Sequence, residues 1–334
     1  FATLPAGNEV DPRVGGAIGT IQPMDYLLAP DGRVVGETTP LPPETPYRVI
    51  PVITSIDPGA IVALLESPES QAAHINAIME LVQRFGFAGV DLSYRRIDPV
   101  YSDTFSAFAA TLAGRLHADG RTLLLSIPMP VVNGAEAETF GYDWEALGEQ
   151  ADFLKIVPPD DQSAYRSQMT AALDYIVSRV DRKKVLLGLS NVAYEKGAEG
   201  IRTMPVADAL ALAATVELRP SDRVVPDAVV TLVGANLVRD AGATGLYWDD
   251  DALSVTFAYP GESGKRTVWV FNAFSAAFRA DLARRYGLGG VWVDNAGAGS
   301  RGADIWAVIQ QYIDTGEVSL AKPNPAMLAP EWRA

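Results

Sequence analysis

The stretch FAGVDLSYRRID, residues 87–98, is central to the fold prediction. Its first half has the composition of a buried strand, because Val90 and Leu92 favour strands and Gly89 permits close packing. Its second half places polar residues, Ser93 to Arg96, where such a strand would leave a sheet. The strand ends of parallel α/β barrels often carry catalytic carboxylates. Here two arginines occupy such an end, and their role is the question that the sequence raises.

The composition excludes several classes of protein. The 334 residues carry a formal net charge of -14, with no cysteine and two histidines. This acidity argues against nucleic-acid binding, which needs clustered Lys and Arg. The absence of cysteine excludes thiol catalysis, disulfides and thiolate metal sites, and two histidines argue against a Ser-His-Asp triad or a His-rich zinc site. The chain has no run of eighteen apolar residues that would span a membrane, and we expect no cofactor and no metal.

Short apolar runs alternate with amphipathic helices along most of the chain. Parallel strands that are covered on both faces have this near-continuous apolar character. The predicted strands lie within residues 17–28, 47–55, 85–94, 121–129, 151–159, 183–191 and 288–296. Helices are expected between them, and the first long helix has Ser67 as its N-cap, Pro68 at its first position and Gly86 at its end. The alternation predicts an α/β fold, a TIM (β/α)8-type barrel.

Seven strands are one fewer than a closed eight-stranded barrel requires, and an open barrel would expose two unpaired edges. Either one strand within the sequence lacks a clear pattern, or the first strand lies upstream of residue 1 in a longer parent chain, and the second explanation is favoured. Residues 244–272 break the alternation and predict a small antiparallel β insertion before the last helix and strand, with a turn at PGESGK. The predicted barrel domain covers residues 1–315, and a Pro-rich tail or linker follows over 316–334.

In their order and spacing, these segments resemble glycoside hydrolase family 18, the chitinase-like barrels, and most closely its spore-germination and cortex-lytic branch. IQPMDYLLAPDGRVV (21–35) resembles that branch's second strand and the hairpin after it. FGFAGVDLSYRRI (85–97) resembles the fourth strand with its D-x-x-D-x-D-x-E signature, and ADFLKIVPPDD (151–161) the sixth strand with its M-x-Y-D. YGLGGVWVDNAG (286–297) resembles the eighth strand, which normally ends in Trp. The resemblance covers roughly residues 15–310 and implies the same barrel.

The resemblance also implies a mechanism, substrate-assisted retention. In that mechanism a Glu protonates the glycosidic oxygen and the substrate's acetamido oxygen attacks the anomeric carbon, oriented by an Asp two residues before the Glu. The middle Asp of the signature matches Asp91, but the first Asp falls on Ala88. The orienting Asp falls on Ser93, the Trp of the motif on Tyr94 and the acid Glu on Arg95.

The other two strands also depart from the family pattern. The Tyr of the sixth strand falls on Pro159, whereas the following Asp matches Asp160, and the Trp of the eighth strand falls on Asp294. Arg95 is the decisive change, because a guanidinium does not release a proton near neutral pH and so cannot serve as a general acid. The inherited hydrolytic mechanism should therefore be absent.

The favoured interpretation is a catalytically inactive domain that acts as a glycan-binding or structural module of a larger exported bacterial protein. Its expected location is extracellular or in the cell envelope, and its expected partners are a glycan or other protein subunits. The candidate ligand-binding residues are Tyr94, Arg95, Arg96, Trp248 and Asp294. One alternative use of the two arginines is the binding of a phosphate, sulfate or uronate. Neutralisation of Asp91, Asp160 and Asp294 is the favoured use in so acidic a chain.

Two other functions remain open. The chain is an active chitin or peptidoglycan hydrolase if its acid has been relocated to Asp160, Asp294 or Asp249, since two carboxylates across a cleft can cleave a glycosidic bond. It is an architectural assembly subunit if it binds no ligand. The run WDDD (248–251) would suit calcium, but a solvated turn is favoured there because the regular spacing of a calcium loop is missing.

Overall fold

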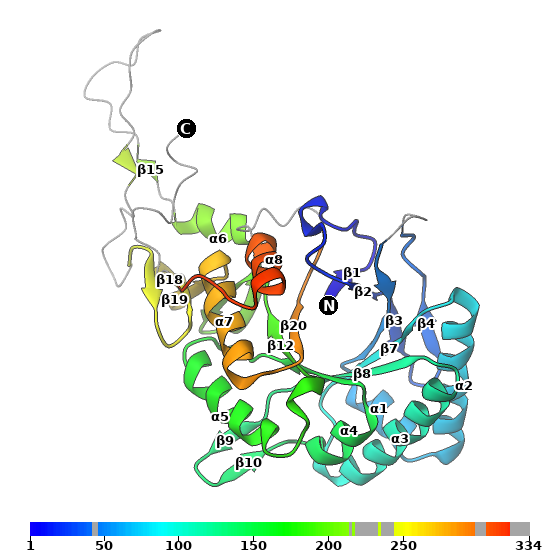
Figure 1. The fold of residues 1–334 in the computed structure, drawn as a ribbon. Helices are drawn as coiled ribbons and strands as arrows, with labels where there is room; N and C mark the ends of the chain where they lie inside the picture. Colours follow the sequence, from blue (N-terminus) through cyan, green and yellow to red (C-terminus); the bar gives the residue numbers. More distant parts are fainter. Residues whose placement is uncertain (42–45, 214–215, 218–232, 235–243, 298–304, 321–334) are drawn as a thin grey trace.

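The computed structural model describes residues 1–41, 46–213, 216–217, 233–234, 244–297 and 305–320. Within these residues, eight parallel strands form a closed barrel with helices outside it (Figure 1). The barrel strands are β1 (Ala2–Pro5), β2 (Thr20–Met24), β6 (Val52–Ser55), β7 (Gly89–Tyr94), β8 (Thr122–Pro128), β11 (Phe153–Val157), β12 (Val185–Leu189) and β20 (Gly290–Val293). The predicted TIM-barrel fold is therefore confirmed.

The first strand closes the barrel. Ala2 of β1 pairs with Val293 of β20 on one side and with Ile21 of β2 on the other. The expectation that the first strand lies upstream of residue 1 is therefore wrong. Only four residues form β1, so it lacks the extended apolar pattern by which the other strands were found.

The seam between the second and third barrel strands is built from short segments. β2 pairs with β5 (Arg48–Val49), and β3 (Tyr26–Leu28) pairs with β6. The two predicted strands at 17–28 and 47–55 are thus each divided in two. β4 (Val34–Gly36) returns along β3 as a hairpin.

The helices cover the outer face of the barrel (Figure 1). Their bounds are α1 (Pro58–Leu65), α2 (Pro68–Phe85), α3 (Ser102–Ala118), α4 (Trp144–Gln150), α5 (Tyr165–Val177), α7 (Ala273–Tyr286) and α8 (Ile305–Thr315), and 3-10 turns lie at Pro12–Val14, Pro99–Tyr101 and Arg182–Lys184. The predicted caps of α2 are present, because Ser67 Oγ accepts the Ser70 N–H and Gly86 adopts φ +66°. None of the helices described has the length and apolar character needed to cross a membrane.

The outward-facing side chains of the strands form the main core with these helices. Val90 and Leu92 of β7 are fully buried there, together with Ile78 of α2 and Leu112 of α3. Gly89 starts the strand where β7 and β8 approach closely, since a Cβ at that position would lie 2.0 Å from the carbonyl oxygen of Thr122. The close packing predicted for this glycine is confirmed.

The antiparallel insertion is larger than the sequence indicated. Its sheet has the order β14-β13-β19-β18-β17 and lies between β12 and α7. The strands are β13 (Ala193–Gly197), β14 (Gly200–Met204), β17 (Tyr247–Asp249), β18 (Ser254–Gly261) and β19 (Gly264–Val270). The turn at PGESGK is as predicted, with Gly261 opposite Gly264, but the hairpin over 193–204 adds two strands outside the predicted 244–272.

Smaller elements complete the described chain. α6 (Val206–Ala213) packs against β19, β15 (Val216–Glu217) pairs with β16 (Val233–Gly234), and the hairpin β9 (Val131–Asn133) and β10 (Glu136–Glu138) follows β8. The predicted tail at 316–334 lies mostly outside the described residues, which end at 320.

Candidate functional site

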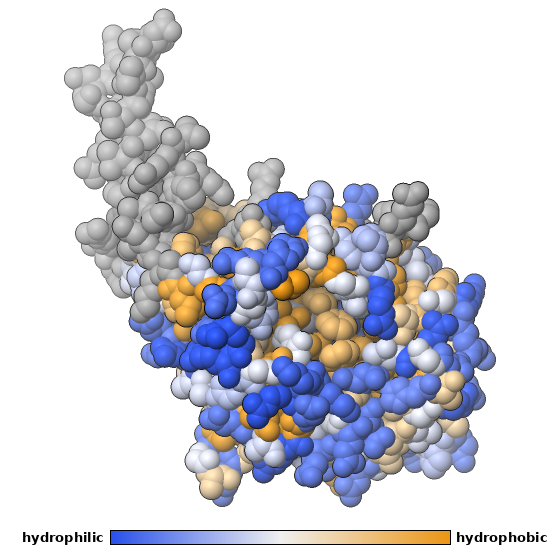
Figure 2. Space-filling model, in the orientation of Figure 1, coloured by the Kyte–Doolittle hydropathy of each residue, from blue (hydrophilic) through white to orange (hydrophobic). Residues whose placement is uncertain are grey.

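A cavity of about 200 Å³ opens at the carboxyl ends of the barrel strands. In Figure 2, hydrophobic surface at the centre of this view is surrounded by hydrophilic residues. The cavity brings together four of the residues singled out from the sequence, namely Ser93, Arg95, Asp160 and Asp294. It is also lined by Trp292 and by residues that sequence reasoning did not place there, among them Thr3, Lys155, Ser190, Tyr194 and Thr203.

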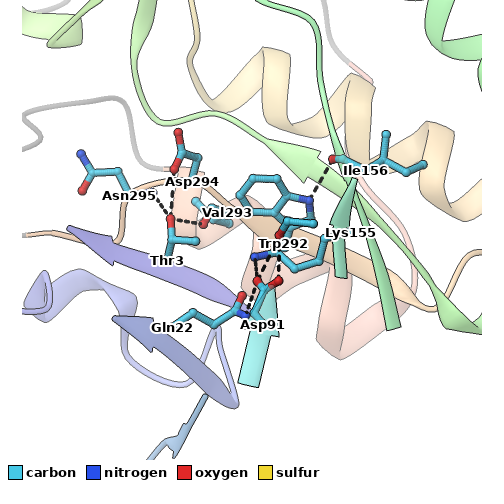
Figure 3. Close-up of polar contacts among 10 residues, drawn as sticks. Thr3, Gln22, Asp91, Lys155, Ile156, Trp292, Val293, Asp294 and Asn295 are labelled. Atoms are coloured by element: carbon cyan, nitrogen blue, oxygen red, sulfur yellow. Dashed lines mark hydrogen bonds and ion pairs between the residues drawn. The ribbon is translucent and has the colours of Figure 1, made fainter. Parts of the chain in front are cut away.

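The base of the cavity is a buried ion pair between β7 and β11. Lys155 Nζ lies 2.6 Å from Asp91 Oδ2, and the two side chains are 1% and 0% exposed. Asp91 also accepts a hydrogen bond from Gln22 Nε2 of β2 at 2.9 Å (Figure 3). A further hydrogen bond comes from Ser126 Oγ of β8 at 3.0 Å. The one acidic residue retained from the D-x-x-D-x-D-x-E signature is thus neutralised by a lysine.

Trp292 of β20 lies beside this pair. Lys155 Nζ is 4.3 Å from the centre of the Trp292 ring, within cation–π range, and the indole N–H donates to the Ile156 carbonyl oxygen at 3.0 Å (Figure 3). These contacts fix the ring of Trp292 as an apolar surface in the cavity lining. The family Trp was expected two positions later, at Asp294.

Asp294 and Tyr194 form the polar wall of the cavity. Asp294 Oδ1 accepts a hydrogen bond from Thr3 Oγ1 at 3.0 Å, which ties β20 to β1. Burial raises the pKa of Tyr194 to about 12, and the carboxylates of Asp294 and Asp160 raise it too. The phenol therefore keeps its proton at neutral pH, and this wall offers both hydroxyl donors and carboxylate acceptors.

Arg95 extends beyond β7 at the mouth of the cavity. Its backbone N–H donates to the Ser55 carbonyl oxygen at 2.9 Å, but among the residues described its guanidinium makes no ion pair and no hydrogen bond. The expectation that the arginines neutralise Asp91 is wrong, because Lys155 does so from β11, which lies beyond β8 in the barrel. An exposed guanidinium is thus left at the cavity.

Tyr94 points away from the cavity. Side chains alternate along a strand, so Asp91 and Ser93 face the barrel interior while Tyr94 faces the helices. Its ring is 1% exposed, and its hydroxyl shares a short hydrogen bond with His74 Nε2 of α2. Arg96 is exposed with φ +62° and lies outside the cavity lining. Ala88 precedes β7, at the opposite end of the strand from the cavity.

The WDDD run covers the end of β17 and the turn after it, outside the cavity lining. The indole N–H of Trp248 donates to Asp250, and its ring packs on Phe278 of α7. Asp249 Oδ1 accepts the backbone N–H groups of Asp251 and Ala252. Asp249 therefore stabilises a turn, and of the three candidates for a relocated acid only Asp160 and Asp294 line the cavity.

A second cavity of about 410 Å³ adjoins the first. The two share Arg95, Val157, Pro158 and Asp160 in their linings. The second is also lined by Pro159, by the segment 128–133 and by Phe140, whose side chain is 40% exposed. Together the cavities form a groove, with Arg95 and Asp160 at its middle.

The loop that carries Asp160 is held by a buried arginine of α7. Arg279 is 1% exposed, stacks on Tyr165 at 3.6 Å and donates to Gln162 Oε1 at 2.6 Å. Gln162 in turn donates to the carbonyl oxygen of Pro159. These contacts position Asp160 at the cavity.

The model of the family "Glycosyl hydrolases family 18" matches residues 55–298, well over half of the chain. In Bacillus subtilis (strain 168), the "Putative sporulation-specific glycosylase YdhD" is 22% identical over 194 residues. That match covers 53% of this chain and 46% of the relative, so the chain matches about half of that protein's length.

Two solved structures show the same fold. A chitinase from Chromobacterium violaceum ATCC 12472 superposes with a TM-score of 0.73 at 22% identity, covering 94% of this chain and 98% of that one. The spore cortex-lytic enzyme SleL of Bacillus megaterium QM B1551 superposes with a TM-score of 0.70 at 16% identity, covering 97% of this chain and 74% of that one. At these identities the likeness concerns the fold alone.

Proposed function

This chain belongs to glycosyl hydrolases family 18, and from that premise we propose that it binds a saccharide at the barrel mouth without cleaving it. The proposal includes a role as a module of a larger exported bacterial protein, outside the cell or in its envelope. The names of two similar proteins, a sporulation-specific glycosylase and a spore cortex-lytic enzyme, support that location.

The observation that carries the proposal is Arg95. It takes the position of the family's acid, and its side chain lines the cavity in which a glycosidic bond would lie. A general acid must hold a proton that it can release near the working pH, and a guanidinium does not release its own. A saccharide bound here would meet a permanent cation where the mechanism needs a proton donor.

The Asp91–Lys155 pair supports the same proposal. In the family mechanism, carboxylates of the fourth strand stabilise the positive charge that develops on the reacting sugar. Here Ser93 is uncharged and Asp91 is already paired with Lys155 at 2.6 Å. The features needed to bind a sugar remain, since Trp292, Tyr194 and Asp294 offer an apolar ring, a hydroxyl donor and a carboxylate acceptor in one cavity.

Calorimetry combined with product analysis tests this function. A chitin tetrasaccharide and purified peptidoglycan glycan strands would be titrated into the protein, and the mixtures then analysed by mass spectrometry for shorter products. We expect binding without cleavage. Thr203→Trp, which places a large ring at the exposed edge of the cavity, should abolish binding, and Lys265→Trp at an exposed position of β19 in the same sheet, outside the cavity lining, is the matched control. Products that disappear in Thr203→Trp would overturn the proposal, and no binding at all would favour the architectural role.

A relocated acid is the second candidate, because Asp160 and Asp294 line one cavity. Asp160 is exposed, and among the described residues its carboxylate has no hydrogen bond or ion pair. It shares the cavity with the cation Arg95 as well as with Asp294. If the wild-type protein yields products, their loss in Asp160→Asn or Asp294→Asn would assign the acid.

A further inference from the structure

We propose that the saccharide bound at this cavity is acidic and that Arg95 binds its carboxylate. This inference rests on the proposed function and specifies the class of ligand. The observation behind it is the guanidinium of Arg95, which lines both cavities of the groove and makes no hydrogen bond or ion pair among the residues that the structure describes.

The position of Arg95 suits recognition of a ligand. Its backbone is fixed by the hydrogen bond to the Ser55 carbonyl oxygen, so the side chain starts from a rigid strand end. A ligand that extends from one cavity to the other must pass it. The planar fork of a guanidinium matches a carboxylate in a bidentate arrangement.

The other cations near the groove already have partners. Lys155 is paired with Asp91 below the first cavity, at 2.6 Å. Lys196 is paired with Asp161 beside the second cavity, also at 2.6 Å. Arg279 is fully buried and holds Gln162. Among the described residues lining the groove, Arg95 is thus the cation that remains for a ligand.

The two carboxylates in the cavity limit how acidic the ligand can be. Asp160 and Asp294 are acceptors and suit the hydroxyl or amide donors of uncharged sugar rings. They would repel a ligand with a carboxylate on every ring, as would the net charge of -14. We therefore expect acidic and uncharged rings to alternate, so that the carboxylate meets Arg95 and the neutral rings meet the aspartates.

Calorimetric titration with four tetrasaccharides tests this inference. A chitin tetrasaccharide is neutral, and a galacturonic acid tetrasaccharide is acidic on every ring. In a hyaluronan tetrasaccharide, acidic and N-acetylated rings alternate. The fourth ligand is the same hyaluronan tetrasaccharide with its carboxylates reduced to alcohols. We expect the alternating ligand to bind most tightly, and its reduced form to bind about tenfold more weakly or worse, as the loss of one charge-assisted bidentate contact implies.

Two variants assign the effect to one side chain. Arg95→Gln should lower the affinity for the alternating ligand about tenfold and leave that for its reduced form unchanged. Arg96→Gln is the matched control, because Arg96 is the adjacent exposed arginine but lines neither cavity. Circular dichroism would verify that both variants are folded.

The outcomes separate the two proposals. Equal binding of the neutral, alternating and reduced ligands, or an unchanged preference in Arg95→Gln, overturns the role of Arg95 but leaves saccharide binding intact. Tightest binding of the fully acidic ligand overturns the alternating pattern. If none of the four ligands binds and peptidoglycan glycan strands do not bind either, the proposed function fails together with this inference.

Discussion

Replacement of Lys155 by methionine should destabilise the barrel by about 3 kcal/mol. The substitution removes the ammonium group that lies 2.6 Å from Asp91 and leaves a carboxylate that is 0% exposed. Breaking one side of a buried ion pair typically costs about 3–5 kcal/mol. Asp91 keeps its hydrogen bonds from Gln22 and Ser126, so the lower end of that range is expected.

The double variant Asp91→Asn/Lys155→Met isolates the charge. It removes both charges and keeps a polar group for Ser126, so it should lose about 1 kcal/mol or less. The two single substitutions would then be non-additive by about 2 kcal/mol or more, which is typical of groups in direct contact. A carboxylate without a partner takes up a proton at low pH. The cost of Lys155→Met alone should therefore decrease as the pH is lowered.

Urea unfolding at pH 7 measures these differences. Tryptophan fluorescence and far-UV circular dichroism must give coincident transitions before the free energies of unfolding are compared. A loss below about 1 kcal/mol for Lys155→Met, or additivity of the two substitutions, would refute the view that Asp91 depends on this lysine.

Three further results are expected. Burial lowers the pKa of His74 from 6.5 to about 4. Between these two pH values, His74 therefore binds a proton in the unfolded chain but not in the folded one. The free energy of unfolding should fall by up to about 3 kcal/mol as the pH drops from 6.5 to 4, and His74→Gln should remove this dependence in urea titrations. Gly89→Ala should lower the free energy of unfolding by about 3 kcal/mol in the same assay, because its Cβ would strike the backbone of β8. Gly114→Ala on the exposed face of α3, where a Cβ meets nothing within 4 Å, should instead raise it by about 0.5–1 kcal/mol. Equal effects of the two substitutions would contradict the packing argument. Arg95→Glu alone should not cleave a chitin tetrasaccharide, as measured by mass spectrometry, because Asp91 stays paired with Lys155. Cleavage products would show that the Asp91–Lys155 pair does not block catalysis.

The sequence predicted the barrel because its signal is repeated. Each long strand and its helix carries the same alternation, so one unclear element does not change the result. β1 was missed because four residues at the start of the chain show no period, and β13 and β14 were missed because the short runs AYEKG and GIRTM show no sustained apolar alternation. In both cases the strand is specified by its pairing partners rather than by its own composition.

Some of the residues that line the cavity could also have been predicted from the sequence. A strand alternates its two faces, so once Asp91 and Ser93 were assigned to the interior, Tyr94 belonged outside. The same alternation on β11 places Lys155 on the same face of the strand as Val157. A lysine that is buried within an apolar strand needs an anionic partner. Its partner could not be deduced, because the Asp91–Lys155 contact depends on how β7, β8 and β11 stagger in the closed barrel.

The ion pair between Lys155 and Asp91 changes the interpretation of Arg95. In so acidic a chain, an arginine next to aspartates is naturally taken as their counter-ion. Lys155 of β11 already neutralises Asp91, so Arg95 is not needed as its counter-ion. Among the residues described, the Arg95 guanidinium makes no hydrogen bond or ion pair at the cavity. If the chain binds without cleaving, as proposed, Arg95 at the position of the acid and the Asp91–Lys155 pair are two separate obstacles to hydrolysis. A reversal of either one alone should leave a barrel that still binds and still does not cleave.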